Sequence, residues 1–210
     1  MTALLLLSPA EARVLASLAE KSITTPAYYP MTVNALVAAA NQKSSREPVM
    51  SLSEGEVGHA LLSLEEKGLV GRDDSGPRAT KWRQKFQHQL LLKTGTQAVL
   101  LTLMLRGAQT TAELRANAAA LGGPAEAEGV QAALDDLADR AQPLVQTLPR
   151  LSGQSAVRHV HLLCGEPDLS ALAAAEPAAR AGSGSGLEAR VAELEQRLAS
   201  LEQRLSALGG

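Results

Sequence analysis

The sequence predicts a mainly helical α+β protein, built from two tandem winged-helix domains followed by a C-terminal coiled-coil helix. Three helical segments precede a hairpin signal, the same order then occurs a second time, and a leucine heptad ends the chain. The apolar residues expected to pack the third helix recur 73 residues later, Val57, Leu61 and Leu64 returning as Val130, Leu134 and Leu137. A constant offset of this kind indicates an internal repeat.

The helices of the first unit are marked by their N-terminal signals. Ser8 offers a capping hydroxyl, and Pro9 suits the first position of a helix that follows it. A second helix is expected over residues 32–40. Ser53 and Glu56 have the spacing of a capping box, which predicts a third helix directly after Ser53.

A hairpin is expected to close the first unit. Leu69 and Val70 begin one strand, a polar turn follows at residues 73–77, and residues 80–86 alternate strictly between two kinds of side chain. Strand geometry then places three basic residues on one face, Lys81, Arg83 and Lys85, and Thr80, Trp82, Gln84 and Phe86 on the other.

The second unit repeats this order. Helices are expected over residues 98–106, 110–121 and 124–140, the second of them opening with another capping box. Strands are expected over residues 144–148 and 156–163. The predicted organisation is winged-helix domain 1 over residues 1–93, domain 2 over 94–165, a flexible linker rich in Ala, Gly, Ser and Pro over 166–186, and a coiled-coil helix over 187–210.

The C-terminal heptad predicts self-association. Its a and d positions are apolar throughout: Leu187, Val191, Leu194, Leu198, Leu201, Leu205 and Leu208. Arginines fall at g and glutamates at e, so a parallel pair brings Arg190 opposite Glu195 and Arg197 opposite Glu202, whereas an antiparallel pair would oppose like charges. We therefore expect a parallel coiled coil, with a dimer favoured over a trimer. A helix that folds back onto its own domains is the alternative.

Composition narrows the functional classes. The formal net charge is −2, which lacks the strongly basic signature of a protein that coats nucleic acid. One cysteine, Cys164, leaves no disulfide framework and favours a cytoplasmic setting. The run of leucines at residues 4–7 is too short to span a bilayer, so no membrane association is expected; it is read as a packing strand or a lead-in to the first helix.

Two segments resemble the hallmark stretches of the YceH family of bacterial proteins. They are EKSITTPAYYPMTVNALVAAANQKSSREPVMSLSEGEV, from Glu20 to Val57, and LMLRGAQTTAELR, from Leu103 to Arg115. The resemblance extends over residues 8–165 and includes a similar terminal coiled coil. It implies tandem winged-helix domains in a cytoplasmic protein, and it implies no established activity.

Duplex DNA is the first candidate partner. The stripe on the expected wing and the polar loop between the second and third helices carry side chains that bind phosphates. The candidate residues are Asn41, Lys43, Ser44, Ser45 and Arg46 in the loop, with Arg78, Lys81, Arg83 and Lys85 on the wing. Because winged helices frequently bind nucleic acid, we expect a DNA-associated or regulatory role with weak sequence preference.

The same residues also admit structural roles. In the loop, Glu47 could pair with Arg46 or Lys43, Asn41 could cap the second helix, and residues 48–50 could anchor in the core. On the wing, the stripe could be the solvated face of an edge hairpin.

A protein adaptor is the alternative function. In a DNA-reading winged helix the third helix enters the major groove, yet residues 53–67 contain four glutamates and one lysine. Such a helix, together with the loop that carries Tyr28 and Tyr29, suits an unidentified protein partner better than phosphates.

Enzymatic chemistry is not expected. His159, His161 and Cys164 have a spacing that two metal ligands on one strand face could share, but neither an acid nor a further thiol lies nearby. The remaining histidines lack a triad pattern, and no glycine motif suits a phosphate cradle. The sequence therefore predicts neither a cofactor nor a catalytic residue.

Overall fold

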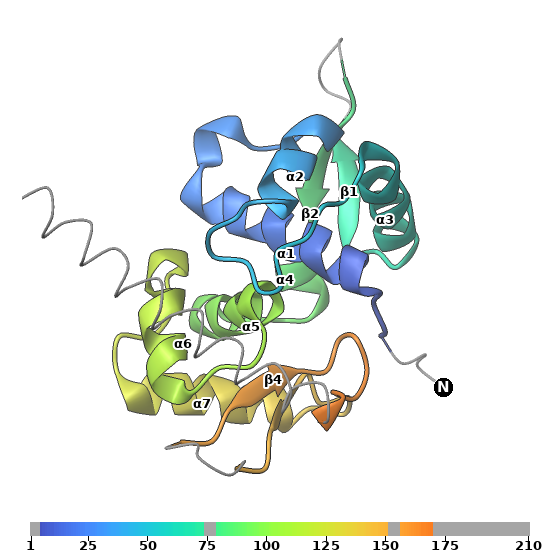
Figure 1. Cartoon of the computed structure of the whole chain (residues 1–210). Coiled ribbons are helices and arrows are strands. Elements are labelled where there is room, and N and C mark those ends of the chain that lie inside the picture. The colour runs from blue at the N-terminus through green and yellow to red at the C-terminus, as the bar shows by residue number, and fades with distance from the viewer. Residues whose placement is uncertain (1–4, 74–78, 151–155, 170–210) are drawn as a thin grey trace, which may run out of the picture. The chain divides into compact units, whose positions relative to one another are not determined.

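The computed structural model describes residues 5–73, 79–150 and 156–169. Met1–Glu166 forms one compact unit and Pro167–Gly210 a second one. The described part is mainly helical with two small antiparallel hairpins, which agrees with the α+β class (Figure 1). Most of the predicted linker and the whole heptad segment lie outside the described residues, so the coiled coil stays a prediction.

The first helix group contains α1 (Pro9–Thr24), the short helix η1 (Pro26–Tyr28), α2 (Val33–Ala40) and α3 (Glu54–Glu66). Ser8 caps α1 and Ser53 caps α3, as the sequence predicts, and in the structure both form capping boxes. Beyond the end of α3, Gly68 has φ of +72°, a conformation in which glycine avoids the steric cost of a Cβ.

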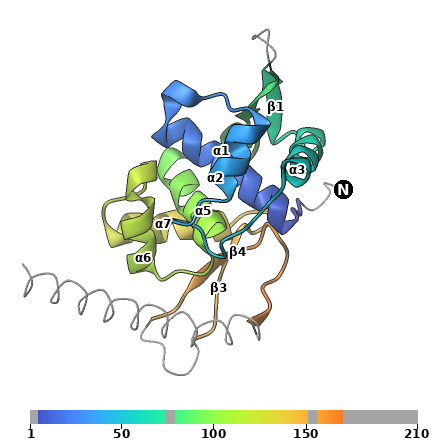
Figure 2. The same ribbon diagram turned by 45° about the horizontal axis from the view of Figure 1, so that its top comes forward.

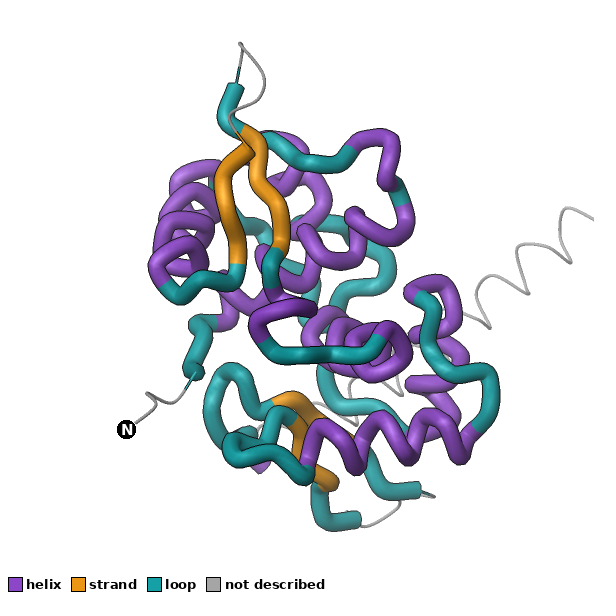
Figure 3. Tube along the Cα trace, turned by 180° about the vertical axis from the view of Figure 1, so that it is seen from behind, coloured by secondary structure: helices purple, strands orange, loops and turns teal. Residues whose placement is uncertain are grey.

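The first hairpin joins β1 (Val70–Asp73) to β2 (Lys81–Gln84), with Val70 opposite Gln84. An antiparallel β-bridge between Met31 and Trp82 pairs a short third segment with β2. The predicted second strand was too long at its end, because Phe86 is fully buried and begins the short helix α4 (Phe86–Gln89). In Figure 3 this hairpin lies beside the helices of the first group, on the side of the molecule opposite the second helix group.

The second group repeats the series with α5 (Thr94–Arg106), α6 (Thr111–Ala118), η2 (Ala119–Leu121) and α7 (Ala127–Ala138). Its hairpin pairs β3 (Val145–Thr147) with β4 (His159–His161), shorter than the strands expected. As in the first group, the segment before the second helix bridges to the second strand, here from Gln109 to His159.

One continuous core runs through both groups. Residues 96–105 of α5 are all buried, and α5 contacts α1, α6, α7 and β4, so it lies between the two helix groups (Figure 2). The N-terminal segment joins the second group, because Leu7 N donates to Leu163 O at 2.7 Å. The predicted boundary between residues 93 and 94 thus falls inside one packed body.

No helix in the described part of the chain is long and apolar enough to cross a membrane.

Candidate functional site

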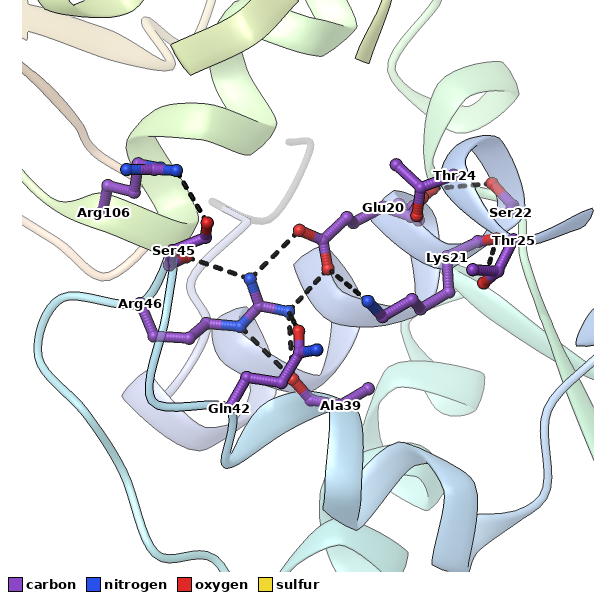
Figure 4. A network of polar contacts seen from close by, with 11 residues as sticks. Glu20, Lys21, Ser22, Thr24, Thr25, Ala39, Gln42, Ser45, Arg46 and Arg106 are labelled. Carbon is purple, nitrogen blue, oxygen red and sulfur yellow. Dashed lines mark hydrogen bonds and ion pairs between the residues drawn. The ribbon is translucent and has the colours of Figure 1, made fainter. Parts of the chain in front are cut away.

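The loop of residues 41–50, the 41–50 loop below, is held to the protein by Arg46. Arg46 as a whole residue is 3% exposed, and its guanidinium donates from Nη1 to Glu20 Oε1 at 3.1 Å and from Nη2 to Glu20 Oε2 at 2.5 Å (Figure 4). It also donates to Ala39 O and to Gln42 Oε1. The donors of this guanidinium are used within the fold, so Arg46 has little capacity left for the expected contact with a phosphate.

The ion pair also corrects the alternative in which Arg46 pairs with Glu47. Arg13, Ser17 and Glu20 follow one another at spacings of four and three, which places them on one face of α1. Arg13 is 3% exposed, and its Nη2 donates to Pro48 O at 2.8 Å. Burial, followed by the nearby charge of Arg46, lowers the pKa of Arg13. The sequence signal for this cluster is the presence of charged residues on a helix face that is otherwise apolar.

The 41–50 loop also reaches the second helix group. Glu47 N donates to Leu105 O at 2.8 Å, and Arg106 Nη2 donates to Ser45 Oγ at 2.7 Å (Figure 4). With Arg13 and Glu20 on one side and the end of α5 on the other, the loop connects the two helix groups.

The other expectations for the 41–50 loop have different outcomes. Asn41 is the C-cap residue of α2, as expected, and it caps the helix through its backbone N–H, which donates to Val37 O at 3.1 Å. Its side chain pairs with the backbone of Leu52: Asn41 Nδ2 donates to Leu52 O, and Leu52 N donates to Asn41 Oδ1, both at 2.8 Å. Pro48 and Val49 are exposed rather than anchored in the core. The predicted phosphate ligands that remain on the surface of the loop are Lys43, Ser44 and Ser45.

On the wing, the arginines already have partners. Arg83 forms an ion pair with Asp73 and lies over the ring of Tyr29, and Arg72 pairs with Glu65 at 2.9 Å and lies over Trp82. The lysines of the stripe are exposed, and no ion pair is recorded for Lys81 or Lys85 among the described residues. Arg78 lies outside the described residues.

The outward face of α3 carries acidic side chains, together with glycines that leave part of the backbone uncovered. The core side is formed by Val57, Ala60, Leu61 and Leu64, so the helical repeat directs Gly55, His59, Leu62 and Glu66 away from the core. The helix contains four glutamates and neither lysine nor arginine. Lys67, the next residue, is bound to Glu11 at 2.5 Å. This face therefore offers no cation to a phosphate.

The histidines of β4 have separate environments. His159 is 3% exposed and lies between the hydroxyls of Thr111 and Thr147, at 3.3 and 3.0 Å from its ring nitrogens. Burial lowers the pKa of His161 to about 4, and its Nδ1 is enclosed with no hydrogen-bond partner among the described residues. Within the described ranges, no group of three or more His, Cys, Asp or Glu side chains is arranged to hold a metal ion.

These features define a mainly helical α+β protein in which two units of three helices and a hairpin share a core and are joined through a loop. A comparison of sequences matches residues 7–154 to the family described as "Protein of unknown function, DUF480".

The UPF0502 protein of Mesorhizobium japonicum is 47% identical over 205 residues, covering 98% of this chain and 97% of its own. That of an Azoarcus species is 45% identical over 189 residues, covering 90% and 83%, and that of Geobacter sulfurreducens is 44% identical over 167 residues, covering 80% and 76%. The chain belongs to this bacterial family, and the predicted YceH-type membership is confirmed.

Proposed function

We propose that the protein is a non-enzymatic adaptor made of two winged helices, that it self-associates through residues 187–210, and that it binds a protein partner through the outward face of α3. The winged-helix assignment is supported by the order of three helices and a hairpin in both units. It is supported further by the β-bridges Met31–Trp82 and Gln109–His159, which in both units pair a short third segment with the second strand of the hairpin.

The acidic outward face of α3 carries the proposal. In a winged helix that reads DNA, this helix enters the major groove, where its side chains approach phosphates and base edges. Glu54, Glu56 and Glu66 would repel phosphates there, whereas they can attract a basic segment of a protein.

Two glycines make the same face suited to close packing. A Cβ built on Gly55 or Gly58 meets no atom within 4 Å, so nothing within the described fold requires a glycine at either position. Glycine in a helix costs roughly 0.5–1 kcal/mol relative to alanine. Beside them, Leu62 is 47% exposed. The two glycines leave the helix backbone uncovered next to the exposed Leu62, and glutamates lie around them. A basic amphipathic segment can approach such a surface closely.

Duplex DNA remains a second candidate because of the two wing lysines. Lys81 and Lys85 are exposed on the hairpin, and Lys43, Ser44 and Ser45 are exposed on the 41–50 loop. Contacts limited to these groups would involve few phosphates, so binding would be weak, insensitive to sequence and lost as salt rises.

Site-specific photocrosslinking in cells tests the adaptor function. A photoreactive residue at Leu62 is expected to capture a defined protein, and the same residue at Ala112, which is exposed on α6, is the matched control. Capture should be weakened when Glu66→Lys reverses the charge at that position beside Leu62. Products that are the same from both positions would contradict the proposal.

Binding to a generic duplex, measured at low and at rising salt, tests the second candidate. Little binding is expected at low salt. Strong binding that falls steeply with salt and is lost in Lys81→Gln/Lys85→Gln would favour DNA instead.

A further inference from the structure

A small hollow lies where the two helix groups meet. Its volume is about 80 Å³, and its lining comes from the C-terminal half of α1, the 41–50 loop, α5, α6 and η2. Ligand sites often form at such junctions between structural units. The hollow is independent of the face of α3 and of the wing, and neither proposed partner uses it.

The charge of the carboxylate that lines the hollow is offset by neighbouring cations. Glu20 is the one carboxylate among its described lining residues, and both of its oxygens already accept from Arg46. Lys21 Nζ lies 3.5 Å from Glu20 Oε2, and Arg106 lines the hollow directly. Arg46 and Lys21 therefore offset the charge of Glu20 from outside the lining, and Arg106 is the cation that lines the hollow.

Unused donors point to the same chemistry. Arg106 donates one hydrogen bond, from Nη2 to Ser45 Oγ, and no other partner of its guanidinium is recorded among the described residues. Because Ser45 Oγ accepts this bond, its own proton is free to be donated. Ser45 is held in place with φ of +60° while its carbonyl accepts from Arg46 Nη1 at 3.0 Å. A guanidinium and a hydroxyl fixed beside each other can bind two oxygens of one oxyanion.

We propose that this hollow binds the phosphate group of a small ligand, with Arg106 and Ser45 as the direct donors. The volume admits one group of that size, so the rest of a larger ligand would extend into solvent. A phosphate presents more acceptor oxygens than a carboxylate does, so it can accept from Arg106 and Ser45 together and keep further oxygens in water. Since Ser45 and Arg106 belong to different helix groups, the bound phosphate bridges them.

Titration of the full-length protein with inorganic phosphate, followed by NMR at constant ionic strength with chloride as the reference salt, tests the site. Saturable shifts are expected for the Ser45 amide and the Arg106 Nε–H. Arg106→Gln should raise the Kd roughly tenfold or more, because a charged hydrogen-bond donor is lost. The matched control is Arg115→Gln, an exposed arginine of α6, whose Kd should equal that of the wild type.

A second variant, Ser45→Ala, and a second ligand, a short DNA duplex, provide independent tests of the site. Ser45→Ala should also weaken binding, and the amide spectrum of each variant reports whether the fold is intact. The proposal is overturned if no saturable response occurs at phosphate concentrations on the order of 10 mM, ten times a millimolar Kd. It is equally overturned if Arg106→Gln binds phosphate as the wild type does, or if a short duplex shifts these signals and phosphate does not.

Discussion

The side chain of Arg46 is fully buried, and its partner Glu20 retains 12% of its side-chain exposure. Removing one member of a buried ion pair leaves the other charge without compensation, which costs about 3–5 kcal/mol. We therefore expect Arg46→Gln to lower the free energy of unfolding by about that amount in urea denaturation. Lys43→Gln, in the same loop but exposed, should change it by less than about 0.5 kcal/mol. Equal effects of the two substitutions would contradict the structural role of Arg46.

His161 predicts a pH dependence of stability. Its pKa in the folded protein is about 4 because burial disfavours the charged ring, against 6.5 for an ordinary histidine. Since the folded pKa lies below the unfolded one, the unfolded chain takes up the proton first as the pH falls. The stabilisation is complete above pH 6.5 and is lost progressively down to about pH 4, by up to about 3 kcal/mol. Urea titrations at several pH values should show a shallower decline in His161→Gln, and an unchanged decline would refute the assignment.

At the residue scale, the sequence could show which side chains were charged but not which were already paired. Arg46 and Lys43 have the same local context in the sequence, yet one is buried against Glu20 and the other is exposed. The difference arises from contacts 26 residues apart along the chain, which no local pattern encodes. The same holds for Arg83, whose pairing with Asp73 depends on the register of the hairpin.

At the scale of an element, α3 allows a test of its two glycine environments. Gly58 is inside the helix with open space where a Cβ would lie, so Gly58→Ala should stabilise the protein by about 0.5–1 kcal/mol. Gly68 has φ of +72°, and a Cβ there would lie 3.0 Å from Gln89 Nε2, so Gly68→Ala should destabilise it by roughly 1 kcal/mol or more. Thermal unfolding of both variants measures the signs. Destabilisation by Gly58→Ala would mean that this glycine serves the fold and not a partner.

The helices were predictable because their starts are local. Capping boxes at Ser8, Ser53 and Thr110 involve residues only three positions apart, and all three occur in the structure. Strand ends were less predictable: the alternation through residues 80–86 continues past β2, but Phe86 leaves the strand because its ring is buried in the core. Alternation reports which side chains face inward and does not fix where backbone pairing stops.

At the scale of the whole molecule, the repeat in the sequence did not reveal how closely the two units are joined. The offset of 73 residues predicts two similar series, while the shared core and the 41–50 loop join them into one body. Ten consecutive residues of α5 are buried because elements of both helix groups pack against it. Such a helix has no polar face, so its sequence lacks the amphipathic pattern from which a packing face is predicted.

Self-association belongs to the same scale, and it rests on residues outside the described ranges. All seven a and d positions of the heptad are apolar, so deletion of residues 187–210 should convert a dimer into a monomer, as measured by light scattering. The helical circular dichroism signal of the remaining chain should persist, because the core lies within residues 5–166. Three heptads are marginally stable alone, so the dimer of the full chain should dissociate on dilution.

The substitution Arg197→Glu tests the orientation of the two helices. In a parallel pair it places like charges opposite each other, at residue 197 and Glu202, and should weaken the dimer. In an antiparallel pair, which opposes Arg to Arg, the same substitution should strengthen the dimer. An unchanged mass after the deletion would exclude the coiled coil, and a tighter dimer in Arg197→Glu would exclude its parallel orientation.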